Sequence, residues 1–414
     1  MAGMSLACRR VGLRIADAAR NPIMTRRLLV ACLSVAAAMA FTPGSAPAQN
    51  APVSDGISTA PDEWLLANRG QPWWYDVRSS QNPLALRARA PTENERAIVD
   101  RARALLSGRP AKALALLDGD SVVYVDYKLP ASADSVFFGF SMGKTVTAMA
   151  VGQAICDGKL TFETRAGDVV PQLTGTALGE ASVRDLLRMA SGAAEPLSDS
   201  TIWTPEQFKR WGQGQLTIIE SVTEERVSKA ARGVFSEYKP GERFYYKSTD
   251  PMVLGLMVTR ATNMPYSNWA QKTIFDPMGV AGPGFIVQDK QGDGATDAAI
   301  RLRLDDWIRF AQWVKRSSKL PGCFGDFVRA ATRTQIENAG TPATRKSGKG
   351  FGGYGYLTWT DNAIAPGTAW ALGHGGQRIG WHRDSDRMVI VFSNAENWMS
   401  DISELARDWN RAGR

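Results

Sequence analysis

The most informative segment of this sequence is Phe138-Gly139-Phe140-Ser141-Met142-Gly143-Lys144, followed by TVTAMAVGQAICDGKL (145–160). Small and apolar residues recur here at helical spacing, and Gly158 provides a stop, so the segment predicts a helix. Ser141 then stands at the helix N-terminus with Lys144 one turn on. Because residues three apart share a helix face, the hydroxyl and the amine can point into one cleft. Burial helps an amine to lose its proton, and a helix N-terminus favours negative charge, so the pair is typical of an activated serine nucleophile.

A lone S-x-x-K pattern is weak, because it is equally typical of an N-cap serine beside a solvated lysine. A second copy, SEYK (236–239), is followed by Pro240 and Gly241, which cannot continue a helix, so we do not assign it. The first copy is singled out because two further motifs follow it along the chain.

Residues 1–48 have the pattern of an export signal. Met24, a candidate start, precedes Arg26-Arg27 and an apolar run (28–41) that is short for a membrane span, and Ala46-Pro47-Ala48 fits a signal-peptidase site. We expect cleavage near Ala48, a periplasmic or secreted protein, and no membrane span in the mature chain. Two alternatives stay open, a twin-arginine signal and a lipoprotein cleavage box at 29–32.

The mature chain has only a small net positive charge, so its composition does not predict a nucleic-acid partner. The leader holds six arginines and one aspartate, so it carries five of the eight net positive charges and leaves the mature chain near +3. The mature length can bury a large core. We expect an N-terminal arm over 49–92, with an aromatic cluster at 73–75, and a catalytic domain over 93–414.

Cysteine and histidine usage predicts neither a metal nor a cofactor. Cys156 and Cys323 are the cysteines outside the leader, and His374 and His382 are the histidines, with no metal-ligand spacing among them. A disulfide is allowed in an exported protein, but Cys156 on an apolar helix is more typical of a small buried hydrophobic residue.

The order of elements predicts an α/β (α+β) fold. Helices are expected through the middle of the chain, whereas strands are expected near both ends. The architecture predicted is one antiparallel sheet built from both chain ends, flanked by helices, with an inserted helical lobe and the active cleft where the lobe meets the sheet edge. The expected elements are a helix at 93–108, a hairpin around 118–120, helices at 181–192, 204–212, 250–263 and 299–319, loops at 193–203 and 341–353, strands at 354–360, 368–373, 377–383 and 387–395, and a helix at 400–413.

The second motif lies in KPGERFYYKSTD (239–250), a turn and an extended stretch that leads into a helix. Such a loop can hold Tyr246 and Ser248 on one side. The phenol could then share a proton with Lys144 and Ser141, provided that the adjacent ammonium offsets the usual tyrosine pKa near 10. Ser248 could hydrogen-bond the lysine or the substrate. The alternative is a partly buried tyrosine on a structural loop.

The third motif is LGHGGQRI (372–379), between two strand-like runs. Glycines weaken a strand unless a ligand or another backbone comes close. A glycine-lined edge strand would let an extended substrate pair with it and would offer a backbone N–H as an oxyanion donor. The alternative is a tight hairpin with a surface histidine.

Taken in order, these motifs resemble those of the serine β-lactamase and penicillin-recognising superfamily, and more narrowly its class C-type serine hydrolases. The family signatures S-x-x-K, Y-x-N or Y-x-S, and K-T-G or H-x-G would be Ser141–Lys144, Tyr246–Ser248 and His374-Gly375-Gly376. The likeness covers roughly residues 94–412. It implies a β-lactamase/transpeptidase-like fold and an acyl-serine mechanism.

The resemblance also implies residue roles. Ser141 would be the nucleophile, Lys144 its proton partner and Tyr246 the general base. The N–H groups of Ser141 and Gln377 would form the oxyanion hole, and His374, Gly375, Gly376 and Ser248 would bind the substrate. Which of Lys144 and Tyr246 takes the proton is left open.

Two departures from the family pattern bear on the substrate. Ser248 replaces the asparagine of true β-lactamases, and His374 replaces the lysine that meets a β-lactam carboxylate. The Y-x-S form is closest to aminohexanoate-dimer hydrolases and carboxylesterases. The expected activity is therefore hydrolysis of a small linear amide or ester. A D-alanyl peptidase or β-lactamase, or a penicillin-binding sensor with little turnover, is the alternative.

Ser141 also sits in a G-x-S-x-G pattern, as in the nucleophile elbow of α/β-hydrolases. That fold needs a downstream acid, which Asp250 or Asp361 could supply, and a histidine, which His374 could supply. It also needs alternating strands and helices, which this order of elements does not favour.

Overall fold

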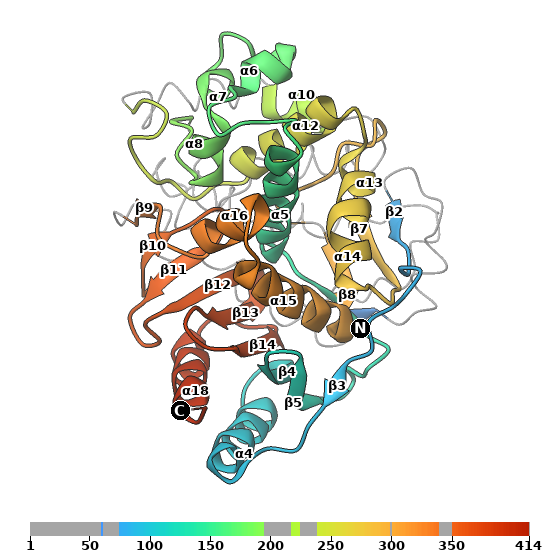
Figure 1. The fold of residues 1–414 in the computed structure, drawn as a ribbon, viewed down its shortest axis with the longest axis vertical. Helices are drawn as coiled ribbons and strands as arrows, with labels where there is room; N and C mark the ends of the chain where they lie inside the picture. The colour runs from blue at the N-terminus through green and yellow to red at the C-terminus, as the bar shows by residue number, and fades with distance from the viewer. Residues whose placement is uncertain are drawn as a thin grey trace, which may run out of the picture. The chain divides into compact units, whose positions relative to one another are not determined.

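The structure is a computed structural model of the chain, and it describes residues 59–60, 74–193, 217–223, 238–298, 300–338 and 350–413 (Figure 1). The predicted export signal (1–48), the helix at 204–212, and most of the loops predicted at 193–203 and 341–353 lie outside these residues.

A nine-stranded sheet forms the centre of the described fold, in the order β3-β5-β4-β14-β13-β12-β11-β10-β9. Neighbouring strands are antiparallel except for β3 and β5, which are parallel. Because β14 pairs with β4 along its length, the two ends of the chain meet in the middle of the sheet, as the strand pattern predicts. The strands are β3 (Arg87–Ala88), β4 (Ala111–Asp118), β5 (Ser121–Tyr127), β9 (Ile336–Glu337), β10 (Phe351–Tyr354), β11 (Trp359–Asn362), β12 (Thr368–Gly373), β13 (Gln377–His382) and β14 (Arg387–Ser393).

A second, five-stranded sheet was not predicted. Its strands, in the order β1-β6-β8-β7-β2, are β1 (Thr59–Ala60), β6 (Val136–Phe138), β8 (Ile300–Arg303), β7 (Gly284–Val287) and β2 (Trp74–Val77). The predicted arm is thus part of both sheets, because β2 pairs with β7 and β3 with β5.

The prediction of one helix over 299–319 was wrong at its start. Residues 300–303 form β8, and helix α15 begins at Leu304. Ile300 and Leu302 are buried while Arg301 and Arg303 are half-buried, which is strand alternation. The helical pattern of the following residues masks this short strand in the sequence.

The prediction of one strand over 354–360 was also wrong. The chain turns between β10 and β11, where Gly355 N donates to Thr358 O at 2.8 Å and Leu357, with a left-handed backbone (φ 48°), donates to Leu187 O at 2.9 Å. A Cβ at Gly355 would lie 2.1 Å from Ala331 O, so the turn packs closely on the end of α16.

Helices cover both faces of the large sheet. Helices α4 and α18 pack on one face, whereas α5 and α15 pack on the other (Figure 1). The helical lobe packs around α5, which is buried along most of its length. The helices are α4 (Glu93–Gly108), α5 (Met142–Cys156), α6 (Ala166–Val169), α7 (Ala177–Glu180), α8 (Val183–Leu187), α10 (Ile218–Thr223), α12 (Thr249–Thr262), α13 (Tyr266–Ala270), α14 (Asp276–Met278), α15 (Leu304–Lys319), α16 (Cys323–Ala331) and α18 (Met399–Arg411), with the further helical turns η1 (Pro171–Leu173), η2 (Gln271–Phe275) and η3 (His374–Gly376).

The interpretation of Cys156 as a small buried hydrophobic residue was wrong, and the disulfide that the sequence left open is formed. Cys156 at the end of α5 and Cys323 at the start of α16 form a disulfide, with their Cα atoms 5.7 Å apart. The two cysteines are 167 residues apart in sequence, so their proximity depends on the packing of α16 against α5, which the sequence pattern does not show. None of the helices in the described ranges is long and apolar enough to cross a membrane.

Candidate active site

Ser141 stands directly before α5, at a point where the backbone is tightly constrained. Phe140 has a left-handed backbone (φ 46°), which is unfavourable for an aromatic residue and is a kind of strain that clusters at functional sites. A Cβ at Gly139 would lie 2.6 Å from the indole of Trp307. This close packing fixes the approach to the helix and presents the serine hydroxyl at its N-terminal end.

The amine of Lys144 contacts the serine directly. Lys144 Nζ lies 3.0 Å from Ser141 Oγ and donates a hydrogen bond of 2.9 Å to the carbonyl oxygen of Asp297. The lysine is 2% exposed, so protein groups rather than bulk water surround its amine. Since an ammonium has three donor positions, one remains for a further partner.

Tyr246 lies against the same amine. Lys144 Nζ is 5.2 Å from the centre of the Tyr246 ring, and the tyrosine is 6% exposed. The ring stacks on Trp359 with centroids 5.2 Å apart and meets Tyr354 edge-on at 6.2 Å. These aromatic contacts hold the ring without using its hydroxyl. Sequence reasoning missed Trp359 and Tyr354, because their positions depend on the pairing of β10 with β11.

The loop that carries Tyr246 is fastened by its backbone to the segment after α8. Gly241 N donates to Ala190 O at 2.7 Å, and Tyr245 N donates to Met189 O at 2.8 Å. Gly241 has a left-handed backbone (φ 87°), which suits the turn predicted at this position.

A buried ion pair lies beside this loop. Lys247 Nζ donates to Ala193 O at 2.7 Å and is 3.6 Å from Asp250 Oδ1, which also accepts a 2.7 Å hydrogen bond from Ser191 Oγ. Burial raises the pKa of Asp250, whereas the Lys247 charge and the Ser191 hydrogen bonds act in the opposite direction. Ser248, which is buried, occupies the N-cap position of α12 between these residues. This network fixes the residues after Tyr246 and ties them to the segment at 191–193. Together with the backbone hydrogen bonds before Tyr246, it anchors the loop on both sides of that residue.

The third motif forms the turn η3, which joins β12 to β13. Gly375 and Gly376 have left-handed backbones (φ 72° and 94°), which a glycine adopts most readily. A Cβ at Gly373 would lie 2.2 Å from Gly139 O, so the end of β12 touches the backbone two residues before Ser141. The glycines thus allow the turn to approach the nucleophile.

His374 and Glu396 form a pair at the rim of this turn. His374 Nδ1 lies 3.0 Å from Glu396 Oε1, and the same oxygen accepts a 3.1 Å hydrogen bond from Gly375 N. The hydrogen bond raises the pKa of His374 and lowers that of Glu396. The imidazole also meets the ring of Phe140 edge-on at 5.6 Å, next to the nucleophile.

The side chains of Gln377 and Arg378 hold the turn in place by hydrogen bonds to backbone carbonyl groups in and beside it. The Gln377 side chain is buried and donates to His374 O and Ser393 O, each at 2.9 Å. Arg378 Nη1 donates to Gly373 O at 2.6 Å and to Gln377 O at 2.7 Å. Burial lowers the pKa of Arg378 to about 10, with the charges of Glu396 and Tyr246 opposing that shift. Sequence reasoning missed Arg378 and Glu396.

The structure therefore brings the three motifs to one place. Ser141 and Lys144 are in contact, Tyr246 lies against Lys144, and His374 reaches the same region through Phe140. Within the described ranges no group of three or more histidine, cysteine or acidic side chains is placed to hold a metal ion.

The alternative of an α/β-hydrolase elbow does not fit. Asp250 pairs with Lys247 and Asp361 accepts a hydrogen bond from Thr334, whereas the acid on His374 is Glu396. The large sheet is also antiparallel over almost all of its pairs, rather than parallel with alternating helices.

Comparison with known proteins agrees with this fold and set of motifs. The family model described as Beta-lactamase matches residues 98–413, and the chain belongs to this family. It is accordingly a β-lactamase-family hydrolase, as the resemblance in its motifs predicts. Penicillin-binding protein 4* of Bacillus subtilis (strain 168) is 24% identical over 153 residues, which are 37% of this chain and 31% of that protein. The match thus spans about a third of that relative's length.

Solved structures confirm the predicted fold class. A candidate 6-aminohexanoate-dimer hydrolase from Bacillus anthracis superposes with a TM-score of 0.63 at 15% identity, covering 81% of this chain and 89% of that one. The hydrolase EstCE1 gives 0.57 at 16% identity (77% and 98% covered). A β-lactamase/D-alanine carboxypeptidase from Pseudomonas syringae gives 0.56 at 15% identity (78% and 100% covered). At such identities these likenesses speak for the fold alone.

Proposed function

We propose that the protein hydrolyses a small linear amide or ester through an acyl-serine intermediate on Ser141. The observation that carries this proposal is the 3.0 Å contact between Lys144 Nζ and Ser141 Oγ beneath the ring of Tyr246. Since Lys144 is buried and Tyr246 nearly so, the three groups can exchange a proton away from bulk water.

In the acylation step, Ser141 Oγ attacks the substrate carbonyl carbon while its proton passes to Tyr246 with Lys144 as proton partner. To accept this proton, Tyr246 must start with a negatively charged phenol oxygen, which a cationic amine beside the ring stabilises, and the transfer leaves a neutral phenol. Collapse of the tetrahedral intermediate breaks the carbonyl–leaving-group bond, and the same proton goes to the departing amine or alcohol. Water then attacks the acyl-serine by the reverse sequence and returns the proton to Oγ.

The backbone N–H groups of Ser141 and Gln377 are the proposed oxyanion donors. Ser141 is at the start of α5, where the helix dipole favours negative charge, and Gln377 begins β13 directly after the glycine turn. The side chain of Gln377 holds that turn to Ser393. Donors fixed in this way need no rearrangement when charge develops in the transition state.

The rim of the site favours an amide or ester over a β-lactam. In place of a lysine it presents His374 paired with Glu396. The carboxylate offsets the positive charge that would attract a carboxylate on the substrate. Ser248, with a single hydroxyl, replaces an asparagine amide at the start of α12, and we propose that it binds the lysine or the substrate. The named activity of the Bacillus anthracis neighbour, hydrolysis of an aminohexanoate dimer, is of this amide class.

The alternative is a cell-wall peptidase, a β-lactamase or a penicillin-binding sensor with little turnover. It has support from the match to penicillin-binding protein 4* and from the Pseudomonas syringae neighbour. These activities share the acylation step with the proposed hydrolase, so the rate of deacylation and the choice of substrate distinguish them.

We also propose that the protein is exported, with a signal peptide cleaved near Ala48. The Cys156–Cys323 disulfide supports this, because disulfides persist mainly in oxidising compartments. N-terminal sequencing of the protein from a periplasmic fraction tests the cleavage site. An unprocessed N-terminus found only in the cytoplasmic fraction would contradict export.

Turnover of an activated ester such as p-nitrophenyl acetate tests the hydrolase proposal. We expect steady product release by the wild-type protein, loss of release in Ser141→Ala, and no change in Ser107→Ala, whose serine is exposed on α4. A burst of one equivalent followed by no release would support the sensor. A panel of small amides, D-amino-acid peptides and penicillins then assigns the substrate class. Full turnover of all of them by Ser141→Ala would reject the mechanism.

A further inference from the structure

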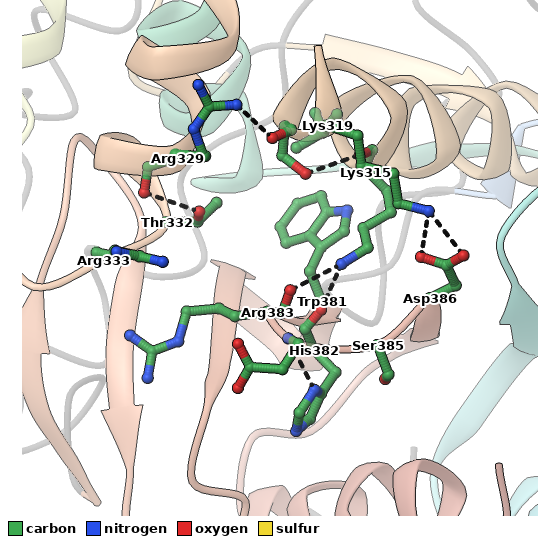
Figure 2. A pocket seen from close by; sticks show the side chains of 13 residues that line it. Lys315, Lys319, Arg329, Thr332, Arg333, Trp381, His382, Arg383, Ser385 and Asp386 are labelled. Carbon is green, nitrogen blue, oxygen red and sulfur yellow. Dashed lines mark hydrogen bonds and ion pairs between the residues drawn. The ribbon is translucent and has the colours of Figure 1, made fainter. Parts of the chain in front are cut away.

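A separate pocket lies at the far end of β13 from the candidate active site. Its cavity has a volume of about 240 Å³ and is bordered by the end of α15, the turn after α16 and the turn between β13 and β14 (Figure 2). Gln377 begins β13 and His382 ends it, so the strand separates the two sites by about 17 Å at 3.4 Å per residue. None of the proposed catalytic residues lines this pocket.

The lining of the pocket is rich in positive charge. It has five cationic side chains against two carboxylates: Lys315, Lys319, Arg329, Arg333 and Arg383 against Asp384 and Asp386. Two of the cations are paired with carboxylates. Lys319 Nζ pairs with Asp386 at 2.7 Å, and Arg329 donates to Ser318 O and Leu320 O at 2.8 and 2.9 Å as well as to Asp326.

Lys315 belongs to the floor of the pocket. It is 6% exposed, and its amine donates to His382 O at 2.9 Å and to Arg383 O at 3.0 Å, which leaves one donor position unused. The indole of Trp381 lies next to this amine (Figure 2) and is held by a 2.9 Å hydrogen bond from its Nε1 to Ala311 O. The floor is therefore rigid, with one cationic and one apolar part.

Arg333 and Arg383 are the cations that remain available. Throughout the described part of the chain, neither guanidinium has a hydrogen bond or an ion pair. Arg333 is exposed and Arg383 is half-buried, and both extend along the same side of the cavity (Figure 2). Besides Asp386, which pairs with Lys319, the pocket lining has one carboxylate, Asp384. The two arginines without an ion pair therefore outnumber it.

We propose that this pocket binds the phosphate or carboxylate group of a small organic anion between Arg333 and Arg383. A guanidinium matches the geometry of both groups with two parallel N–H donors, which a surface lysine cannot do. The unused donor of Lys315 would reach the same anion from the floor, and the Trp381 indole would cover an apolar part of the ligand. The proposal is independent of the hydrolase activity, because it uses no residue of the candidate active site.

Titration calorimetry with the mature full-length chain in low-salt buffer tests this proposal. The probes are inorganic phosphate and succinate in separate arms, so that the two sources of anionic charge are distinguished. The test variant is Arg333→Gln/Arg383→Gln. The matched control is Arg96→Gln/Arg103→Gln, which removes the same charge from the exposed face of α4.

We expect saturable binding of at least one probe, weakened at least tenfold in the test variant and unchanged in the control, since a charge-assisted hydrogen bond supports about a tenfold effect or more. Hydrolysis of the activated ester should be equal in all three proteins, which shows that the variants are folded. Equal affinity in the test variant, or heats no larger than those of the same concentration of chloride, would overturn the proposal.

Discussion

Two buried lysines lie close to the candidate site, and their partners differ in kind. Lys247 is paired with the Asp250 carboxylate, whereas Lys144 contacts a serine hydroxyl and a backbone carbonyl. A buried ion pair fixes structure, and removing one member leaves a charge uncompensated. An amine beside a hydroxyl can instead exchange a proton with it. We therefore assign Lys144 to the chemistry and Lys247 to the positioning of the Tyr246 loop.

Substitution of Tyr246 distinguishes its proposed role from that of His374. Loss of a general base reduces turnover by about 10² to 10⁴-fold, so we expect Tyr246→Phe to lower kcat by this amount while acting little on folding. His374→Ala should raise KM more than it lowers kcat, because the imidazole lies at the rim. Steady-state kinetics on one activated ester measures both. The reverse ranking would favour a histidine-based mechanism.

The His374–Glu396 pair should be visible in the pH titration of the histidine. The hydrogen bond to Glu396 raises the pKa of His374 above 6.5 and lowers that of Glu396 below 4.5. The pair therefore makes its full contribution to the free energy of unfolding between pH 4.5 and pH 6.5. It is lost as the pH rises through the raised pKa of His374 or falls through the lowered pKa of Glu396.

We expect Glu396→Gln to return the pKa of His374 toward 6.5, measured from its imidazole protons by NMR. With His382 as the only other histidine, the assignment is direct, and the His382 signal is the internal control. An unchanged titration of His374 in the variant would show that the pair does not form in solution.

At the scale of elements, the approach of β12 to the start of α5 shapes the site. Gly373→Ala would put a methyl group 2.2 Å from Gly139 O. We expect an over-packing loss of about 1–3 kcal/mol in the free energy of unfolding, with a drop in ester turnover of at least tenfold. Urea unfolding and kinetics measure the two effects.

Gly108→Ala is the matched control for Gly373→Ala. Gly108 ends α4, and nothing lies within 4 Å of a Cβ placed there. The substitution should leave stability unchanged or raise it by less than about 1 kcal/mol, with normal turnover. Equal free energies of unfolding and equal turnover in the two alanine variants would show that the close contact at Gly373 affects neither stability nor activity.

The disulfide joins the C-terminal end of α5, the helix that follows Ser141, to α16. Cys156→Ser/Cys323→Ser should lower the free energy of unfolding by about 2–4 kcal/mol, mainly because the unfolded chain gains freedom. Thermal unfolding with and without reductant measures this. Reductant should lower the Tm of the wild-type protein and leave the double variant unchanged. A wild-type Tm that is the same with and without reductant would indicate that the disulfide does not form.

The elements that sequence reasoning predicted well are those with a long, regular pattern. Helix α4 has the predicted bounds, and the hairpin of β4 and β5 turns at Gly119 and Asp120 as expected. The elements that it missed are short or non-local. The strand β8 is four residues long and adjoins a helix, and the small sheet assembles from segments up to about 240 residues apart.

At the scale of the molecule, the sheet built from both chain ends brings distant motifs together. Ser141 precedes α5, Tyr246 precedes α12, and the glycine turn follows β12. Helix α5 packs against both α12 and the β12–β13 part of the sheet, so all three motifs meet at its N-terminal end. The motif residues were predictable because each has a local pattern.

The partners of those residues were not predictable. Arg378 on β13 and Trp359 on β11 meet the site through the packing of the sheet, and Glu396 meets it from the loop after β14, so none of the three carries a local signal. The basic pocket is likewise assembled from α15, α16 and the turn after β13. A single sequence thus indicates which residues to propose as reacting groups, and the tertiary structure shows which side chains contact them.

Active-site labelling tests the central assignment most directly. The mature protein is treated with a fluorophosphonate and, in parallel, with a fluorescent penicillin, and the modified peptide is mapped by mass spectrometry. We predict one equivalent of fluorophosphonate on the peptide that contains Ser141, weak or transient labelling by the penicillin, and neither label in Ser141→Ala. A stable label on any other residue, or full labelling of Ser141→Ala, would contradict the account.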